Sequence, residues 1–313
     1  MLLSIEKRLA NLLNVQQHQV ENTVALLDGG ATVPFIARYR KEITGGLDDT
    51  QLRLLAEKLT YLRELDERRE TILKSINEQD KLSPELEQQI YAADNKTTLE
   101  DLYLPYKPKR RTKSQIAKEA GLEALALSLL ENQAQEPLLL AAQYLNPEAN
   151  INTPQDALDG ARYILLDVFA ENAALLAKLR ERFTYEGILC AKVIAGKEEQ
   201  GAKFSDYFAH QELVKNIPSH RALAILRGNN EGFLNIAIEY PELQTLARGE
   251  VSHFEQLIIN EFTITDNLAA SNWLRECVRL TWKAKIYPSL ENELLGIMRE
   301  QADTEAIKVF ATN

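Results

Sequence analysis

The stretch TQLRLLAEKLTYLRELDERRETILKSINEQ, residues 50–79, carries the clearest fold signal in the sequence. Its apolar residues recur every three or four positions, which is the spacing of one face of an α-helix. They are Leu52, Leu55, Leu59, Leu62, Leu65, Ile72 and Ile76. One turn is skipped at Arg69, which we group with the charged residues of the opposite, solvated face. The pattern predicts a long helix, capped by Asp48 or Asp49, that packs against other helices.

Shorter helices precede this one. Residues 4–13 and 16–27 have helical spacing, and Gly29-Gly30 ends the second segment. A short helix follows around residues 34–41, with Pro34 in the first turn, where its missing N–H costs nothing. The second and third helices therefore form a helix-turn-helix-like element.

The third helix supplies the first candidate nucleic-acid-binding residues, Arg38, Arg40 and Lys41. A recognition helix presents basic side chains of this kind on its exposed face. We expect Phe35, Ile36 and Tyr39 to pack inward. A purely structural hairpin is the alternative, because many helical hairpins have this spacing.

Further helices are expected towards the C-terminus. Ser83-Pro84 and Thr153-Pro154 are helix starts, and the second helix extends to about Phe183. Residues 93–112 are non-periodic and hold two prolines, whereas FLNIAIE at 233–239 alternates and predicts a strand without an evident partner. We expect an all-α fold, mainly helical with at most one or two short strands. The expected parts, 1–110, 111–203 and 204–313, form one elongated assembly.

Composition and charge limit the possible classes of protein. Two cysteines that are far apart in 313 residues fit a reducing cytoplasm, and no apolar run approaches the length of a membrane span. We expect a soluble, cytoplasmic protein without a membrane partner. Residues 1–113 are neutral, with 18 basic and 18 acidic residues, so the net charge of −10 falls entirely on residues 114–313. An anionic partner should therefore meet the first third.

The strongest local signal is KPKRRTK at 107–113, in which five of seven residues are basic. They are Lys107, Lys109, Arg110, Arg111 and Lys113. Five phosphate contacts would give a salt slope of roughly −4.5, and Tyr103 or Tyr106 could stack a base for ~1–3 kcal/mol. The alternative is a loop whose cations pair with acidic parts of the same protein.

The sequence offers no convincing catalytic site. His18, His210, His220 and His253 are scattered, and neither a metal-binding histidine pair nor a phosphate-binding glycine loop is present. His210 with Glu212 could act as a general base, although ordinary surface roles are the stronger interpretation. We expect no enzyme activity, no cofactor, no metal and no small-molecule substrate.

Six segments spread along the chain form a specific pattern. They are VPFIARYRKEITGGLDDTQLR at 33–53, EDLYLPYKPKRRTKSQIAKEAGLEALA at 100–126, FSDYF at 204–208, IPSHRALAILRGNNEGFL at 217–234, WKAKIYPSLENEL at 282–294 and EAIKVFATN at 305–313. These segments resemble the Tex family of bacterial transcription-accessory proteins. The resemblance covers essentially all 313 residues.

The resemblance implies a helical N-terminal region with a helix-turn-helix-type element. In the family an RNase H-like domain, helix-hairpin-helix elements and an RNA-binding OB-fold domain follow, and the matching sequence stops before these. The implied function is a nucleic-acid-binding scaffold in transcription, with RNA or DNA and RNA polymerase as partners. The alternative is a protein-interaction scaffold that docks the missing domains or RNA polymerase without touching nucleic acid.

Overall fold

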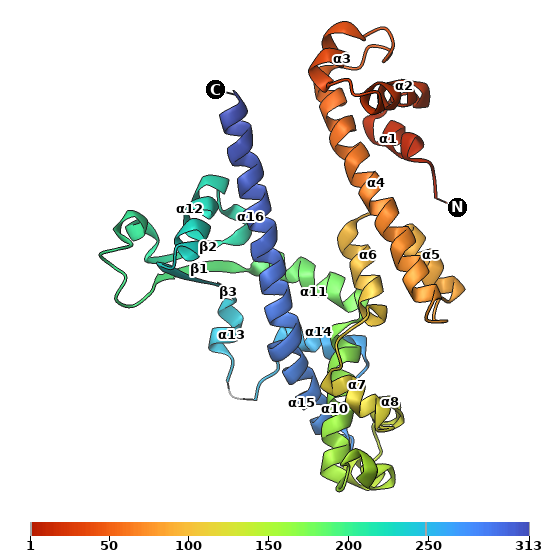
Figure 1. Cartoon of the computed structure of the whole chain (residues 1–313). Coiled ribbons are helices and arrows are strands. Elements are labelled where there is room, and N and C mark those ends of the chain that lie inside the picture. Colours follow the sequence, from red (N-terminus) through yellow and green to blue (C-terminus); the bar gives the residue numbers. More distant parts are fainter. Residues whose placement is uncertain (1, 248, 313) are drawn as a thin grey trace. The chain divides into compact units, whose positions relative to one another are not determined.

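The computed structural model describes residues 2–247 and 249–312, with side chains up to residue 304 (Figure 1). Most of these residues are helical, which confirms the mainly helical fold expected from the sequence. The chain divides into two compact units, Met1–Pro108 and Lys109–Asn313. The side chains of EAIKVFATN at 305–313 lie outside the described residues. Within the described ranges, no helix is both long and apolar enough to cross a lipid bilayer.

The first unit is built around one long helix, α4, as the apolar spacing predicts. The Asp48 carboxylate caps α4 by accepting a hydrogen bond from the Gln51 backbone N–H, and the Gln51 side-chain oxygen accepts one from the Asp48 backbone N–H. The helices of this unit are α1 (Ile5–Leu13), α2 (Gln17–Asp28), α3 (Val33–Tyr39), α4 (Asp49–Asn77), α5 (Pro84–Ala92) and α6 (Lys96–Tyr103).

Two apolar clusters divide α4 between them. Its first half, with Leu52 and Leu55, packs against α1, α2 and α3. Its second half, with Ile72 and Ile76, packs against α5 and α6, as Figure 1 shows. The apolar face of α4 that the sequence predicts is therefore shared by two groups of short helices.

Arg69 is buried on this apolar face of α4, so the prediction that it belongs to the solvated face was wrong. It is only 1% exposed. Its Nε donates to the Ile90 carbonyl at 3.1 Å and its Nη2 to the Ala93 carbonyl at 2.7 Å. It also pairs with Asp66, which in turn pairs with Arg8. The turn skipped by the apolar pattern is therefore filled by a cation at the carbonyl end of α5, where the helix dipole favours positive charge.

The non-periodic stretch before the basic loop contains α6, a helix that the sequence pattern does not predict. Asn95 caps this helix through the Thr98 amide. The helix tightens into a 3-10 turn, Leu104–Tyr106, that contains Pro105. Pro105 therefore limits the helix but does not prevent it, because the eight residues before it can form two turns.

The second unit is also mainly helical. Its helices are α7 (Lys113–Glu119), α8 (Glu123–Glu131), α9 (Pro137–Ala141), α10 (Pro154–Ala170), α11 (Ala173–Glu186), α12 (Ser219–Asn230), α13 (Pro241–Thr245), α14 (His253–Glu261), α15 (Ser271–Thr281) and α16 (Tyr287–Thr312). The single helix expected up to Phe183 is two helices, α10 and α11. Asn172 interrupts the helix and caps α11 by accepting a hydrogen bond from the Leu175 backbone N–H.

A small antiparallel sheet contains three strands, one more than the upper limit expected. The strand foreseen at 233–239 is β3 (Leu234–Glu239), and its partner is β1 (Ile188–Val193), which also pairs with β2 (Ala209–Leu213). The central strand has four apolar residues in a row before Lys192, and β2 is short and polar, so neither alternates. A further division near residue 203 stays a prediction, and β1 pairs with β2 across that position.

Candidate nucleic-acid interface

The short helix α3 is fixed through one side and exposed on the other. Ile36 is fully buried in the cluster that contains Leu47 and Leu52, while Val33 and Ala37 pack partly against it. A helix of seven residues has room for little more than this single anchor. The remaining side chains of α3 therefore project into solvent.

Two aromatic rings lie on this exposed side, which corrects the expectation that they pack inward. Phe35 is 40% exposed and Tyr39 is 59% exposed. Their ring centroids are 5.3 Å apart, within the distance at which aromatic pairs attract each other. Exposed aromatic rings side by side are a surface on which a planar group can stack.

Three cations accompany these rings. Arg38 and Lys41 are exposed, and the Arg40 guanidinium lies 5.1 Å from the centroid of the Phe35 ring. Among the residues whose side chains are described, none of the three has a carboxylate within ion-pair distance. We call Phe35, Arg38, Tyr39, Arg40 and Lys41 the α3 tip.

The turn after α3 is held in place by α2. The Asn22 side-chain amide donates to the Ile43 carbonyl at 3.0 Å, and the Gln19 side-chain amide donates to the Gly45 carbonyl at 2.9 Å. Gly45 and Gly46 have φ values of +64° and +86°, which favour glycine. These contacts fix the backbone just beyond Lys41, so the cations project from an ordered support.

The basic loop 107–113 is extended between the two prolines and α7, as expected, but its cations differ in their surroundings. Lys109 forms an ion pair with Glu171, and partial burial lowers the pKa of the Lys109 ammonium. Arg111 Nη2 lies 2.7 Å from Glu119 Oε2. Lys113 Nζ donates to the Tyr163 hydroxyl at 3.2 Å. In these contacts the cations of the loop bind other groups of the same protein, as the alternative interpretation of the loop expects.

Lys107 and Arg110 are the freer members of the loop. Both are exposed, and the described side chains place no carboxylate within ion-pair distance of either. The tyrosine upstream is less available than the sequence suggests, because Tyr103 is only 7% exposed and shares a 2.9 Å hydrogen bond with Ser75.

His210, a conceivable general base, belongs to a group of ion pairs with Glu212 and Arg221. His210 Nε2 lies 3.1 Å from Glu212 Oε2, and Arg221 Nη1 lies 2.8 Å from Glu212 Oε1. The hydrogen bond from Arg221 holds the pKa of Glu212 below its usual value. A carboxylate stabilised in its ionised form by a guanidinium is a weak proton acceptor.

Comparison with known proteins identifies the family to which the chain belongs. Residues 3–77 match a Tex-like protein N-terminal domain, and residues 132–310 match a Tex central region-like description. The fold is thus a Tex-like N-terminal helical domain followed by a Tex central region. The chain belongs to the Tex family.

Relatives from distant organisms match along nearly all of the chain. It is 55% identical over 99% of its length to the transcriptional accessory protein Tex of Neisseria gonorrhoeae, and 52% identical over 97% to protein YhgF of Escherichia coli. It spans 40% of the length of each. It is also 28% identical over 97% of its length to the human S1 RNA-binding domain-containing protein 1, of which it spans 31%.

Proposed function

We propose that the chain is a nucleic-acid-binding scaffold of a transcription accessory factor, with the α3 tip as its main contact. The observation that carries this proposal is the set of three cations without an ion-pair partner among the described side chains, beside two exposed rings. The names of the relatives, a transcriptional accessory protein and an S1 RNA-binding domain-containing protein, support it.

The chemistry of the α3 tip fits a single strand. Three phosphate contacts to a single strand give a salt slope of about −2, which is roughly a twentyfold loss of affinity between 50 and 200 mM salt. Rings such as Phe35 and Tyr39 gain about 1–3 kcal/mol per stacked base, but only from a base that is not already stacked in a duplex. We therefore expect single strands to bind more tightly than duplexes.

The basic loop is a secondary contact in this proposal. Lys107 and Arg110 can approach phosphates directly. Lys109, Arg111 and Lys113 must first give up contacts with Glu171, Glu119 and Tyr163, respectively. The loop should therefore add less affinity than its five charges suggest.

The test is fluorescence anisotropy with single-stranded RNA and duplex DNA over a salt series. The variant carries Arg38→Glu, Arg40→Glu and Lys41→Glu. Its matched control carries Lys7→Glu, Lys74→Glu and Lys81→Glu, which are exposed cations of the same unit and give the same change in net charge.

We expect the first variant to lose salt-dependent binding and the control to retain most of it. Equal losses would show a non-specific charge effect, and unchanged binding by the first variant would overturn the assignment of the α3 tip. No binding by the unmodified chain at 50 mM salt would overturn the proposed function.

A second candidate function is a protein-interaction scaffold for RNA polymerase or for further domains of the family. The region around α8 and α9 favours it. Residues 119–161 contain seven acidic residues and neither Lys nor Arg, while Leu138 and Leu139 of α9 are 48% and 73% exposed. Paired leucines in an acidic setting suit a basic partner. Leu138→Ser with Leu139→Ser should then abolish capture of RNA polymerase, and unchanged capture would reject this candidate.

A further inference from the structure

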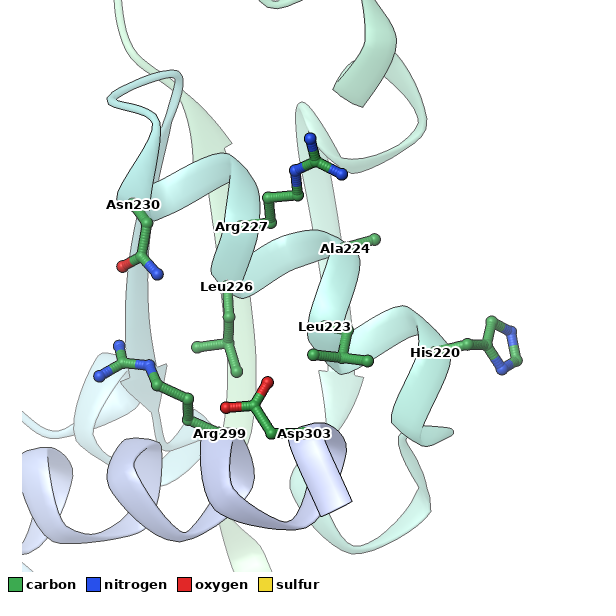
Figure 2. Close-up of a pocket in the computed structure, with 8 residues that line it drawn as sticks. All are labelled: His220, Leu223, Ala224, Leu226, Arg227, Asn230, Arg299 and Asp303. Carbon is green, nitrogen blue, oxygen red and sulfur yellow. The ribbon is translucent and has the colours of Figure 1, made fainter. Parts of the chain in front are cut away.

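A cleft of about 510 Å³ lies between α12 and the C-terminal half of α16 in the second unit (Figure 2). Leu223 and Leu226 point from α12 towards α16, and Arg299 and Asp303 rise from α16 to meet them. The volume falls in the range of small-ligand sites, ~300–1,000 Å³. It is too small for a folded protein or a duplex.

The lining of the cleft combines an apolar floor with polar walls. Leu226 is 2% exposed and forms the floor with the half-buried Leu223. Arg299 supplies a planar cation, Asp303 an acceptor, and Asn230 an amide that can both donate and accept. Within the described side chains, no ion pair engages Arg299 or Asp303. Both groups are therefore available to a ligand.

The charge of α12 contrasts with that of the unit around it. Residues 114–313 carry the whole net charge of −10, yet α12 (Ser219–Asn230) contains Arg221 and Arg227 and no acid, and Arg221 pairs with Glu212 on β2. Arg227 extends from α12 on the side away from α16, and His220 extends sideways from the first turn of α12 (Figure 2). Arg227 forms an ion pair with Glu231, and the Arg227 side chain is nonetheless 72% exposed. A cationic helix beside a cleft in an acidic unit is suited to an anion with a planar, partly apolar part.

We propose that this cleft binds one nucleotide of a single-stranded nucleic acid. The base lies on the floor of Leu223 and Leu226, and its amino or ring N–H groups donate to Asp303. The guanidinium of Arg299 binds the phosphate, for which its planar donor geometry is suited. A neighbouring phosphate reaches Arg227 along the outer side of α12.

This inference rests on the proposed function, because it gives the same ligand a second contact, in the other unit of the chain. It also restricts the ligand. A base inside a duplex is stacked and paired, so it enters the cleft only after unstacking, which costs a few kcal/mol. The cleft therefore accepts single strands.

The first experiment is photo-crosslinking of the full chain to a single-stranded RNA that contains 4-thiouridine, with the modified peptides identified by mass spectrometry. Crosslinks within residues 219–230 or 294–304 are the expected result. Crosslinks confined to residues 33–46 would overturn the inference and leave the proposed function standing. The absence of any crosslink, together with no binding at 50 mM salt, would overturn both.

The second experiment compares Arg299→Glu with Lys283→Glu, an exposed position near the start of α16 that makes the same change in charge. Loss of one single-strand phosphate contact lowers the salt slope by about 0.7, and the affinity at 50 mM salt should fall roughly fivefold to tenfold. The control should change it less than twofold (~0.3 log units). Equal effects of the two substitutions, or duplex binding as tight as single-strand binding, would contradict the cleft assignment. Circular dichroism confirms that both variants fold.

Discussion

At the scale of single residues, Arg69 combines a long apolar stem with a cation, and the cluster between α4 and α5 takes up both parts. Phe35 and Tyr39 are apolar, yet they lie outside because α3 offers one inward position and Ile36 occupies it. Helical spacing identifies the faces of a helix, but it does not tell which of two neighbouring faces meets the rest of the protein.

Removing Arg69 should be far more damaging than removing an exposed arginine of the same helix. Arg69→Ala leaves the buried Ile90 and Ala93 carbonyls without their donor and removes one of the two arginines that pair with Asp66, which should lower the free energy of unfolding by about 3–5 kcal/mol. The matched change is Arg63→Ala, because the Arg63–Asp28 pair is about half exposed and solvent screens it, so its loss should be several times smaller. Urea denaturation measures both, and similar losses would contradict the buried role of Arg69.

The Arg68–Glu100 pair should make part of the stability dependent on pH. Its hydrogen bond from Arg68 holds the pKa of Glu100 below its unfolded value of 4.5. The ionised carboxylate therefore stabilises the folded chain above that value, and this stability is lost as the pH falls through the lowered pKa. Arg68→Gln should reduce the melting temperature at pH 7, and the difference from the unmodified chain should shrink as the pH falls below 4.5 and close once the pH is below the lowered pKa of Glu100. A difference that persists at low pH would assign the effect to packing.

At the scale of elements, helices with strong caps and regular spacing could be read from the sequence, whereas elements defined by their neighbours could not. The start of α4 at Asp48 and that of α10 at Thr153 follow from local hydrogen bonds. The strand β1 does not, because it becomes a strand only by pairing with β2 and β3. The same reason hides the α12–α16 cleft, whose walls are about 70 residues apart in the sequence.

The turn after α3 offers a test of how the α3 tip is supported. Gly45→Ala places a Cβ 2.8 Å from the Gln19 side-chain amide in addition to straining a positive φ, whereas Gly46→Ala strains φ without meeting any atom within 4 Å. Both should destabilise the fold by roughly 1 kcal/mol through backbone strain, and Gly45→Ala by more. Thermal unfolding of the two variants checks this, and a larger loss for Gly46→Ala would contradict the turn geometry.

At the scale of the whole molecule, the two units carry separate cores. The clusters around α4 lie entirely within Met1–Pro108, and the three-stranded sheet lies within Lys109–Asn313. The division of charge follows a nearby boundary, since residues 1–113 are neutral and the rest is acidic. From the sequence we predict that an anionic partner meets the first third of the chain, whereas the ion pairs within the basic loop are visible only in three dimensions.

Each unit should fold without the other if its core is sufficient. A chain of residues 1–108 should show the helical circular dichroism of α1–α6 and a cooperative thermal transition, because a core of this size supports an independent domain. A broad, non-cooperative transition would show instead that the first unit depends on the second.

The central claim is that the α3 tip, more than the basic loop, meets the phosphates. The most direct measurement is the salt slope of single-stranded RNA binding for two triple variants with equal charge change. We predict that Arg38→Glu, Arg40→Glu and Lys41→Glu together lower the slope by about 2. Lys109→Glu, Arg110→Glu and Arg111→Glu together should lower it by only about 0.7, because Lys109 and Arg111 are already paired. The reverse order would contradict the account and make the loop the principal contact.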